Sequence, residues 1–133
     1  MSTMVADIYA LQAKYGFQKD QLTIEKLHLR CDMMKEELGE YETALEHGTP
    51  EDAVDALIDL TVFALGTLAI AGVDIQQAWD EVHDANMSKI RGVKPTRPDT
   101  GGWDLIKPDD WRAPDHDGNT GFLDDAFFET RSM

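Results

Sequence analysis

Three glutamates, Glu36, Glu37 and Glu40, stand close enough together to act as one chemical group. Residues three and four apart lie on the same side of an α-helix, so the three carboxylates would share about 100° of one helix face. Like charges at this spacing repel one another, and hard divalent cations prefer oxygen ligands. The spacing therefore indicates a site for Mg²⁺ or Mn²⁺. A solvated acidic stripe on an exposed helix is the alternative interpretation.

A second acidic pair, Asp55 and Asp59, lies one helical turn apart just before an apolar stretch. An ionised carboxylate on a buried helix is costly unless a partner compensates its charge. Two antiparallel helices joined by a short loop could turn this pair towards the three glutamates. The predicted metal ligands are therefore Glu36, Glu37, Glu40, Asp55 and Asp59, with phosphate oxygens completing the coordination. An exposed acidic stripe, or pairing of the aspartates with basic residues, is the alternative interpretation.

Potential phosphate-binding groups follow in Asn86, Lys89 and Arg91. Asn86 and Lys89 are three residues apart and would project in similar directions from a helix. Their amide and ammonium groups are hydrogen-bond donors that suit phosphate oxygens. Lys89 and Arg91 would also complement the negative end of a helix dipole, which is the alternative interpretation.

Helical segments must position these groups. The apolar spacing predicts helices over residues 3–15, from a cap at Asp20 to about residue 46, from Thr49-Pro50 to near Gly72, and over 75–91. The third segment is apolar on nearly every side, which predicts a helix buried by its neighbours. Residues 1–92 are thus expected to form an all-α catalytic domain, a bundle of four to five helices.

The chain changes character after Gly92, where four of the five prolines occur. Proline and glycine interrupt periodicity, so residues 93–133 are expected to form an irregular tail that packs on the bundle or on a neighbouring subunit. No β-hairpin is predicted in this tail. A short turn is expected around residues 122–128.

Composition limits the remaining possibilities. The chain has 133 residues, of which 42% are hydrophobic, and 26 Asp and Glu against 12 Lys and Arg give a net charge of −14. This length suits one compact domain, and the acidic balance argues against binding to a nucleic acid polymer. One cysteine, no signal-like N-terminus and an uncharged apolar run shorter than the roughly 20 residues of a membrane helix predict a soluble cytoplasmic protein without membrane contact.

Over residues 21–92 the chain resembles the MazG-like, all-α nucleoside triphosphate pyrophosphatase superfamily. This group includes phosphoribosyl-ATP pyrophosphohydrolases and all-α dUTPases. The resemblance lies in Glu36-Glu37-x-x-Glu40, in Asp55-x-x-x-Asp59 and in Asn86-x-x-Lys89. The second motif is usually ExxD, but Ala56 occupies its first position here. Asp59 therefore matches directly, whereas Asp55 is either a ligand or a group that orients one.

The resemblance implies hydrolysis of a (deoxy)nucleoside triphosphate between its α and β phosphates, with two or more Mg²⁺ or Mn²⁺ ions. Glu37, Glu40 and Asp59 would be ligands, and Glu36 a ligand or the base that activates water. Asn86, Lys89 and Arg91 would hold phosphate oxygens, and Lys89 would also stabilise developing charge. The resemblance further implies a homodimer or homotetramer and a dNTP substrate, with purines slightly preferred. Two alternatives stay open: a phosphoribosyl-ATP pyrophosphohydrolase, and a non-catalytic acidic helical interaction protein.

Overall fold

The computed structural model describes residues 3–131, which are mostly helical, as expected for the all-α class. The α-helices are α1 (Met4–Tyr15), α2 (Ile24–His47), α3 (Pro50–Ile70), α4 (Ile75–Met87) and α5 (Leu123–Arg131). Two short strands, β1 (Ile90–Gly92) and β2 (Asp104–Ile106), and two 3₁₀ turns, η1 (Phe17–Lys19) and η2 (Pro98–Thr100), complete the order.

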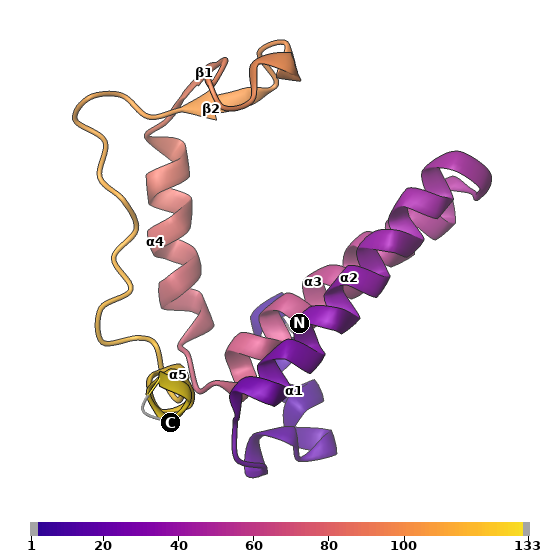
Figure 1. Cartoon of the computed structure of the whole chain (residues 1–133), viewed down its shortest axis with the longest axis vertical. Helices are drawn as coiled ribbons and strands as arrows, with labels where there is room; N and C mark the ends of the chain where they lie inside the picture. The colour runs from indigo at the N-terminus through magenta and orange to yellow at the C-terminus, as the bar shows by residue number, and fades with distance from the viewer. Residues whose placement is uncertain (1–2, 132–133) are drawn as a thin grey trace. The chain divides into compact units, whose positions relative to one another are not determined.

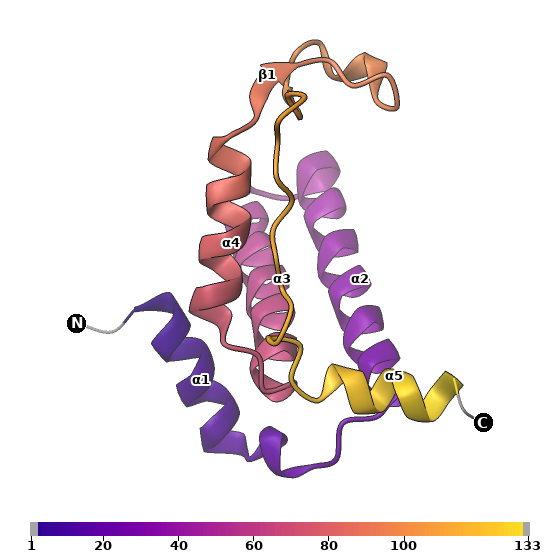
Figure 2. The same ribbon diagram turned by 90° about the vertical axis from the view of Figure 1, so that its left-hand side faces the viewer.

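The chain divides into two compact units, which are described separately. The first contains the residues up to Ile75 and those from Thr120 onward, and the second is Gln76–Asn119. In the first unit α2 and α3 run antiparallel, side by side (Figure 1). Helix α1 packs on α3, and α5 contacts α2 (Figure 2). The role of residues 1–92 as a catalytic domain stays a prediction.

Threonine hydroxyls determine where α2 and α3 begin. Thr23 accepts a hydrogen bond from the Lys26 amide at 3.2 Å, so α2 starts after Thr23 and not after Asp20, the cap expected from the sequence. The Thr49 hydroxyl accepts from the Asp52 amide, and the Asp52 carboxylate accepts from the Thr49 amide, each at 3.2 Å. This capping box, with Pro50 in the first turn, confirms the predicted start of α3.

Partly buried hydrogen bonds join the helices to one another. The Arg30 guanidinium on α2 donates from Nε to Thr67 Oγ1 at 3.0 Å and from Nη2 to the Phe63 carbonyl at 3.2 Å, both on α3. Burial lowers the pKa of Arg30. The Tyr9 hydroxyl on α1 donates to the Val73 carbonyl at 2.9 Å and accepts from the Ile75 amide at 3.0 Å. These bonds hold α2 against α3, and α1 against the segment that connects α3 to α4.

The first half of α3 is less covered than its apolar sequence predicts. Val54 is 63% exposed, Leu57 42% and Ile58 57%. Neighbours within the chain therefore bury only part of this helix, which corrects the expectation of burial on every side. By length and composition alone α3 could cross a membrane, but the core helix of a soluble protein passes the same test.

The second unit contains the hairpin that the sequence did not predict. Helix α4 ends at Met87 and not at 91. The Ser88 and Lys89 amides bond carbonyls three residues back instead of four, and the chain then extends into β1. Strand β1 pairs antiparallel with β2, with Ile90 opposite Ile106. Strands of three residues are too short to show alternation in a sequence, which explains why the pairing was missed.

Helix α5 replaces the short turn expected near residue 122, and Gly121 allows it to dock. The Phe122 amide donates to the Ala71 carbonyl at 2.7 Å. Gly121 has φ +53°, and a Cβ atom there would lie 2.0 Å from the Ala71 oxygen. Only glycine permits this close approach of the two backbones.

Candidate metal and phosphate site

Glu37 is the most perturbed carboxylate in the helix pair. It is half-buried, and its Oε2 atom has neither an accessible surface nor a hydrogen-bond partner. Its pKa is raised, first by burial, next by a hydrogen bond with the Glu40 side chain, and then by the negative charges of Glu40, Asp59 and Glu36. The antiparallel pairing of α2 and α3 thus brings these four predicted residues into one electrostatic cluster.

Asp55 lies on a neighbouring part of the same helix pair. With Glu36 and Glu40 it lines an open groove of about 790 Å³ between the C-terminal half of α2 and the start of α3. His47 and Asp52 also line this groove, and the sequence interpretation overlooked both. Spacing could have identified Asp52, which precedes Asp55 by three residues and shares its helix face, although its carboxylate already caps the helix.

The donor set of this cluster fits a hard divalent cation. Its side chains supply carboxylate oxygens, and Glu37 Oε2 is an inaccessible acceptor without a donor. Among residues 3–131, no three Asp, Glu, His or Cys side chains converge closely enough to hold an ion as they stand. A bound cation would therefore have to draw the carboxylates of α2 and α3 together by side-chain rotation.

The predicted phosphate-binding residues lie in the second unit. Asn86 is exposed near the end of α4, and its carbonyl accepts from the Lys89 amide at 3.1 Å. The Lys89 ammonium lies 5.3 Å from the centre of the Trp111 ring. Arg91 is committed to the hairpin, since its Nε donates to the Gly102 carbonyl at 2.7 Å. Their role in substrate binding stays a prediction.

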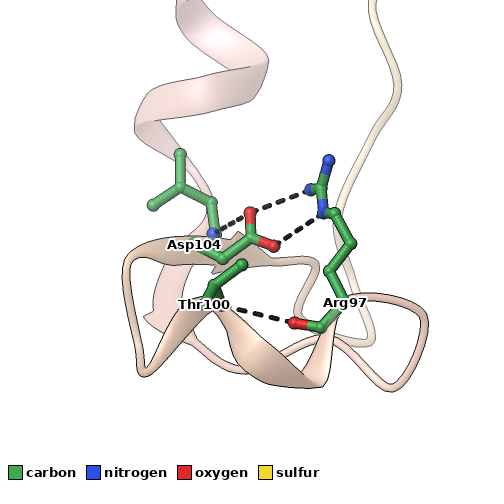
Figure 3. A network of polar contacts seen from close by, with 4 residues as sticks. Arg97, Thr100 and Asp104 are labelled. Atoms are coloured by element: carbon green, nitrogen blue, oxygen red, sulfur yellow. Dashed lines mark hydrogen bonds and ion pairs between the residues drawn. The ribbon is translucent and has the colours of Figure 1, made fainter. Parts of the chain in front are cut away.

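The hairpin is consolidated by a bidentate ion pair. Arg97 Nε and Nη2 each donate to the Asp104 carboxylate at 2.9 Å, and Thr100 bonds the Arg97 carbonyl (Figure 3). The pKa of Asp104 is lowered, first by the hydrogen bond from the Leu105 amide and then by Arg97. The Arg97 guanidinium is thus already paired with a carboxylate of the hairpin.

Replacing Arg97 by glutamine should raise the Asp104 pKa towards its ordinary value, because both charged donors are lost. The Asp104 pKa should not return fully to that value, because the hydrogen bond from the Leu105 amide remains. A lowered carboxyl pKa gives stability that is present above the unfolded-state pKa and lost as the pH falls through the folded-state pKa. The variant should lose the part of that acid-dependent contribution that comes from Arg97. A carboxyl NMR titration measures this, with Arg112→Gln as control; equal Asp104 pKa values in the two variants would contradict the assignment.

Two antiparallel helices that bring three glutamates close to an aspartate are consistent with the fold of the all-α nucleotide pyrophosphatases. The chain belongs to the phosphoribosyl-ATP pyrophosphohydrolase family, whose family model matches residues 11–86. No curated protein and no solved structure matches the chain significantly. The match confirms the resemblance to the MazG-like superfamily. It includes all five acids and Asn86, and ends before Lys89, Arg91 and the tail.

Family membership identifies a hydrolase that acts on a nucleotide pyrophosphate bond. Enzymes of this group generally depend on a divalent metal. They are typically soluble and cytoplasmic, so the apolar character of α3 does not indicate a membrane span.

Proposed function

We propose that the protein is a Mg²⁺- or Mn²⁺-dependent pyrophosphohydrolase that cleaves dNTPs between the α and β phosphates, with purines slightly preferred. The observation that carries this proposal is the Glu37 carboxylate. Its raised pKa and its unpartnered Oε2 atom show a charge that the surrounding protein leaves uncompensated. A divalent cation would compensate that charge and bring a triphosphate to the cluster.

Each side chain would have a distinct role. Glu37, Glu40 and Asp59 would hold the metal, and Asp55 would add a ligand or orient one from the groove. When bound, the metal neutralises phosphate charge and lowers the pKa of a water molecule. Glu36 would accept the proton of the water that attacks the α-phosphorus. The bond to the α–β bridging oxygen breaks, and monophosphate and pyrophosphate leave.

Asn86 and Lys89 are the proposed hydrogen-bond donors to the phosphates. The Asn86 amide and the Lys89 ammonium would contact phosphate oxygens, with Arg91 nearby in the chain. Lys89 would also offset charge that develops on the leaving pyrophosphate. Neither group needs to change its protonation state for this role.

Pyrophosphate release from a substrate panel tests the proposal. The panel contains the canonical dNTPs, the NTPs and phosphoribosyl-ATP, each with Mg²⁺, with Mn²⁺ and with a chelator. Release of monophosphate and pyrophosphate from a dNTP, only with metal, is the expected result. No turnover of any nucleotide, together with no metal binding, would favour the non-catalytic acidic interaction protein.

Phosphoribosyl-ATP is the second candidate substrate, and the name of the matching family favours it. The bond broken is the same α–β anhydride, so the acidic cluster would act identically. The panel separates the candidates, because preferential turnover of phosphoribosyl-ATP would assign the chain to that reaction and exclude the dNTP preference.

A second copy of this chain would cover the exposed apolar side chains of α2 and α3. Leu45 is 64% exposed, Val54 63% and Ile58 57%, all on the helices that carry the acids. Isolated exposed apolar residues are ordinary, but several on one helix pair mark an interface. A homodimer or homotetramer formed through these helices would bury them.

Replacing Ile58 by glutamate should weaken that assembly, because burying an unpaired charge in an apolar interface is costly. The subunit concentration needed for association should rise at least about 100-fold. Analytical ultracentrifugation measures the change. Tyr15→Glu, at a side chain that is 59% exposed on α1, is the matched control. A wild-type monomer, or equal association of the two variants, would contradict the interface.

A further inference from the structure

Two lysine ammonium groups lie over the ring of Trp111 in the second unit. Lys89 Nζ lies 5.3 Å and Lys107 Nζ 4.7 Å from the centre of its ring. The ring is itself fixed, because Trp111 Nε1 donates to the Ala85 carbonyl on α4 at 2.7 Å. Residues from the end of α4 and from the returning segment after β2 thus meet at one aromatic side chain.

The two ammonium groups have no carboxylate partner. Among the side chains that the structure describes, no ion pair at 4.0 Å or less involves Lys89 or Lys107, so neither charge is neutralised by a carboxylate. Contact with the half-buried Trp111 ring attracts each cation but does not neutralise its charge. Two like charges held at one ring still repel each other, and an anion would relieve that repulsion.

The surrounding sequence makes this the cationic part of an acidic chain. Residues 89–112 contain six of the 12 Lys and Arg residues but only four of the 26 Asp and Glu residues. Arg97 is engaged with Asp104, and Arg91 with the Gly102 carbonyl. Lys89 and Lys107 are the two of these cations that lie over the Trp111 ring.

We propose that Lys89 and Lys107, held on Trp111, bind two phosphoryl groups of a polyphosphate, and that Lys107 is a pyrophosphate-binding residue. The identification of the anion as the β- and γ-phosphates of a triphosphate, or as the pyrophosphate product, rests on the proposed function. Two separate cationic points suit a polyphosphate better than a single phosphate, because each ammonium can pair with a different phosphoryl group. Trp111 is a positioning residue that acts through the two lysines.

Calorimetric titration of the full chain with inorganic pyrophosphate tests this assignment. A chelator excludes metal, so that the carboxylates of α2 and α3 cannot contribute. Lys107→Gln should raise the Kd roughly tenfold, as expected for loss of one charge-assisted contact. Lys14→Gln is the matched control, since Lys14 also lies over a ring, that of Tyr15 at 5.4 Å, but without a second cation. No binding by the wild type, or equal Kd values for the two variants, would overturn the assignment.

Two substitutions of Trp111 test its positioning role. Trp111→Leu removes the ring and should raise the Kd as much as Lys107→Gln does. Trp111→Phe keeps an aromatic face but loses the bond to Ala85, and should recover most of the affinity even if its Tm is lowered. Equal Kd values for the two variants would contradict the positioning role and leave Trp111 with a structural role only.

The same variants separate this inference from the proposed function. Asp59→Ala should abolish turnover and leave metal-free pyrophosphate binding unchanged. Lys107→Gln should raise KM for the triphosphate roughly tenfold and change kcat less. If no nucleotide is hydrolysed but pyrophosphate binding still depends on Lys107, the proposed function fails and the polyphosphate site stands. If the protein hydrolyses a triphosphate but Lys107→Gln leaves KM unchanged, the polyphosphate site is refuted and the proposed function stands.

Discussion

Asp59→Asn should lower kcat/KM for the preferred triphosphate by about 10³-fold, the largest loss expected from any single change in the chain. Asp59 is half-buried on α3 and is the residue of that helix whose charge acts on Glu37. An amide of the same shape keeps the packing but removes the negative charge that a divalent cation would require. The loss should appear in kcat at saturating metal, and in metal affinity measured by calorimetry.

Asp32→Asn provides the matched control, because Asp32 is an exposed acid on α2 outside the cluster. It should leave turnover within about twofold of the wild type. Asp55→Asn adds a useful comparison: a loss as large as that of Asp59→Asn would make Asp55 a direct ligand, and a small loss would leave it lining the groove. Retained activity in Asp59→Asn would contradict the metal assignment.

The helices that build the site were predictable because their signals are local. Pro50 and the Thr49 capping box fix the start of α3, and the spacing of Glu36, Glu37 and Glu40 is set by the α-helical repeat. Placing Asp59 with Glu37 required only that α2 and α3 be antiparallel, which their short connection ensures. The electrostatic cluster could therefore be predicted without knowledge of long-range contacts.

The second unit was poorly predicted because long-range contacts hold it. Its hairpin depends on the Arg97–Asp104 pair and on strands of three residues, neither of which leaves a periodic pattern. The meeting of Lys89 and Lys107 depends on the chain folding back so that Trp111 reaches Ala85, 26 residues earlier. Nothing in the local sequence indicated which cations would lie over the Trp111 ring.

Glu37→Gln should separate the stability of the helix pair from its function. At neutral pH, without metal, the wild type must either ionise Glu37 beside Glu40, Asp59 and Glu36 or bind a proton there. A neutral amide avoids both costs, so the variant should have a higher Tm in chelator. Turnover should nevertheless fall by roughly 10²- to 10³-fold, since a ligand is lost. Activity and stability would then move in opposite directions.

The raised pKa of Glu37 determines whether the stability of the wild type rises or falls with pH. A raised pKa means that the folded wild type binds a proton more tightly than the unfolded chain, so the contribution of protonated Glu37 is complete below the unfolded-state pKa. It is lost as the pH rises through the folded-state pKa, and the free energy of unfolding in chelator should decrease across that window. Glu37→Gln should lack this decrease, whereas Glu42→Gln, at an exposed acid of the same helix, should retain it. Saturating Mg²⁺ should stabilise the wild type more than Glu37→Gln, because only the ionised carboxylate gains a cation. Parallel pH profiles for the wild type and Glu37→Gln, with equal stabilisation by Mg²⁺, would show that Glu37 is a solvated surface acid and not the centre of a metal site.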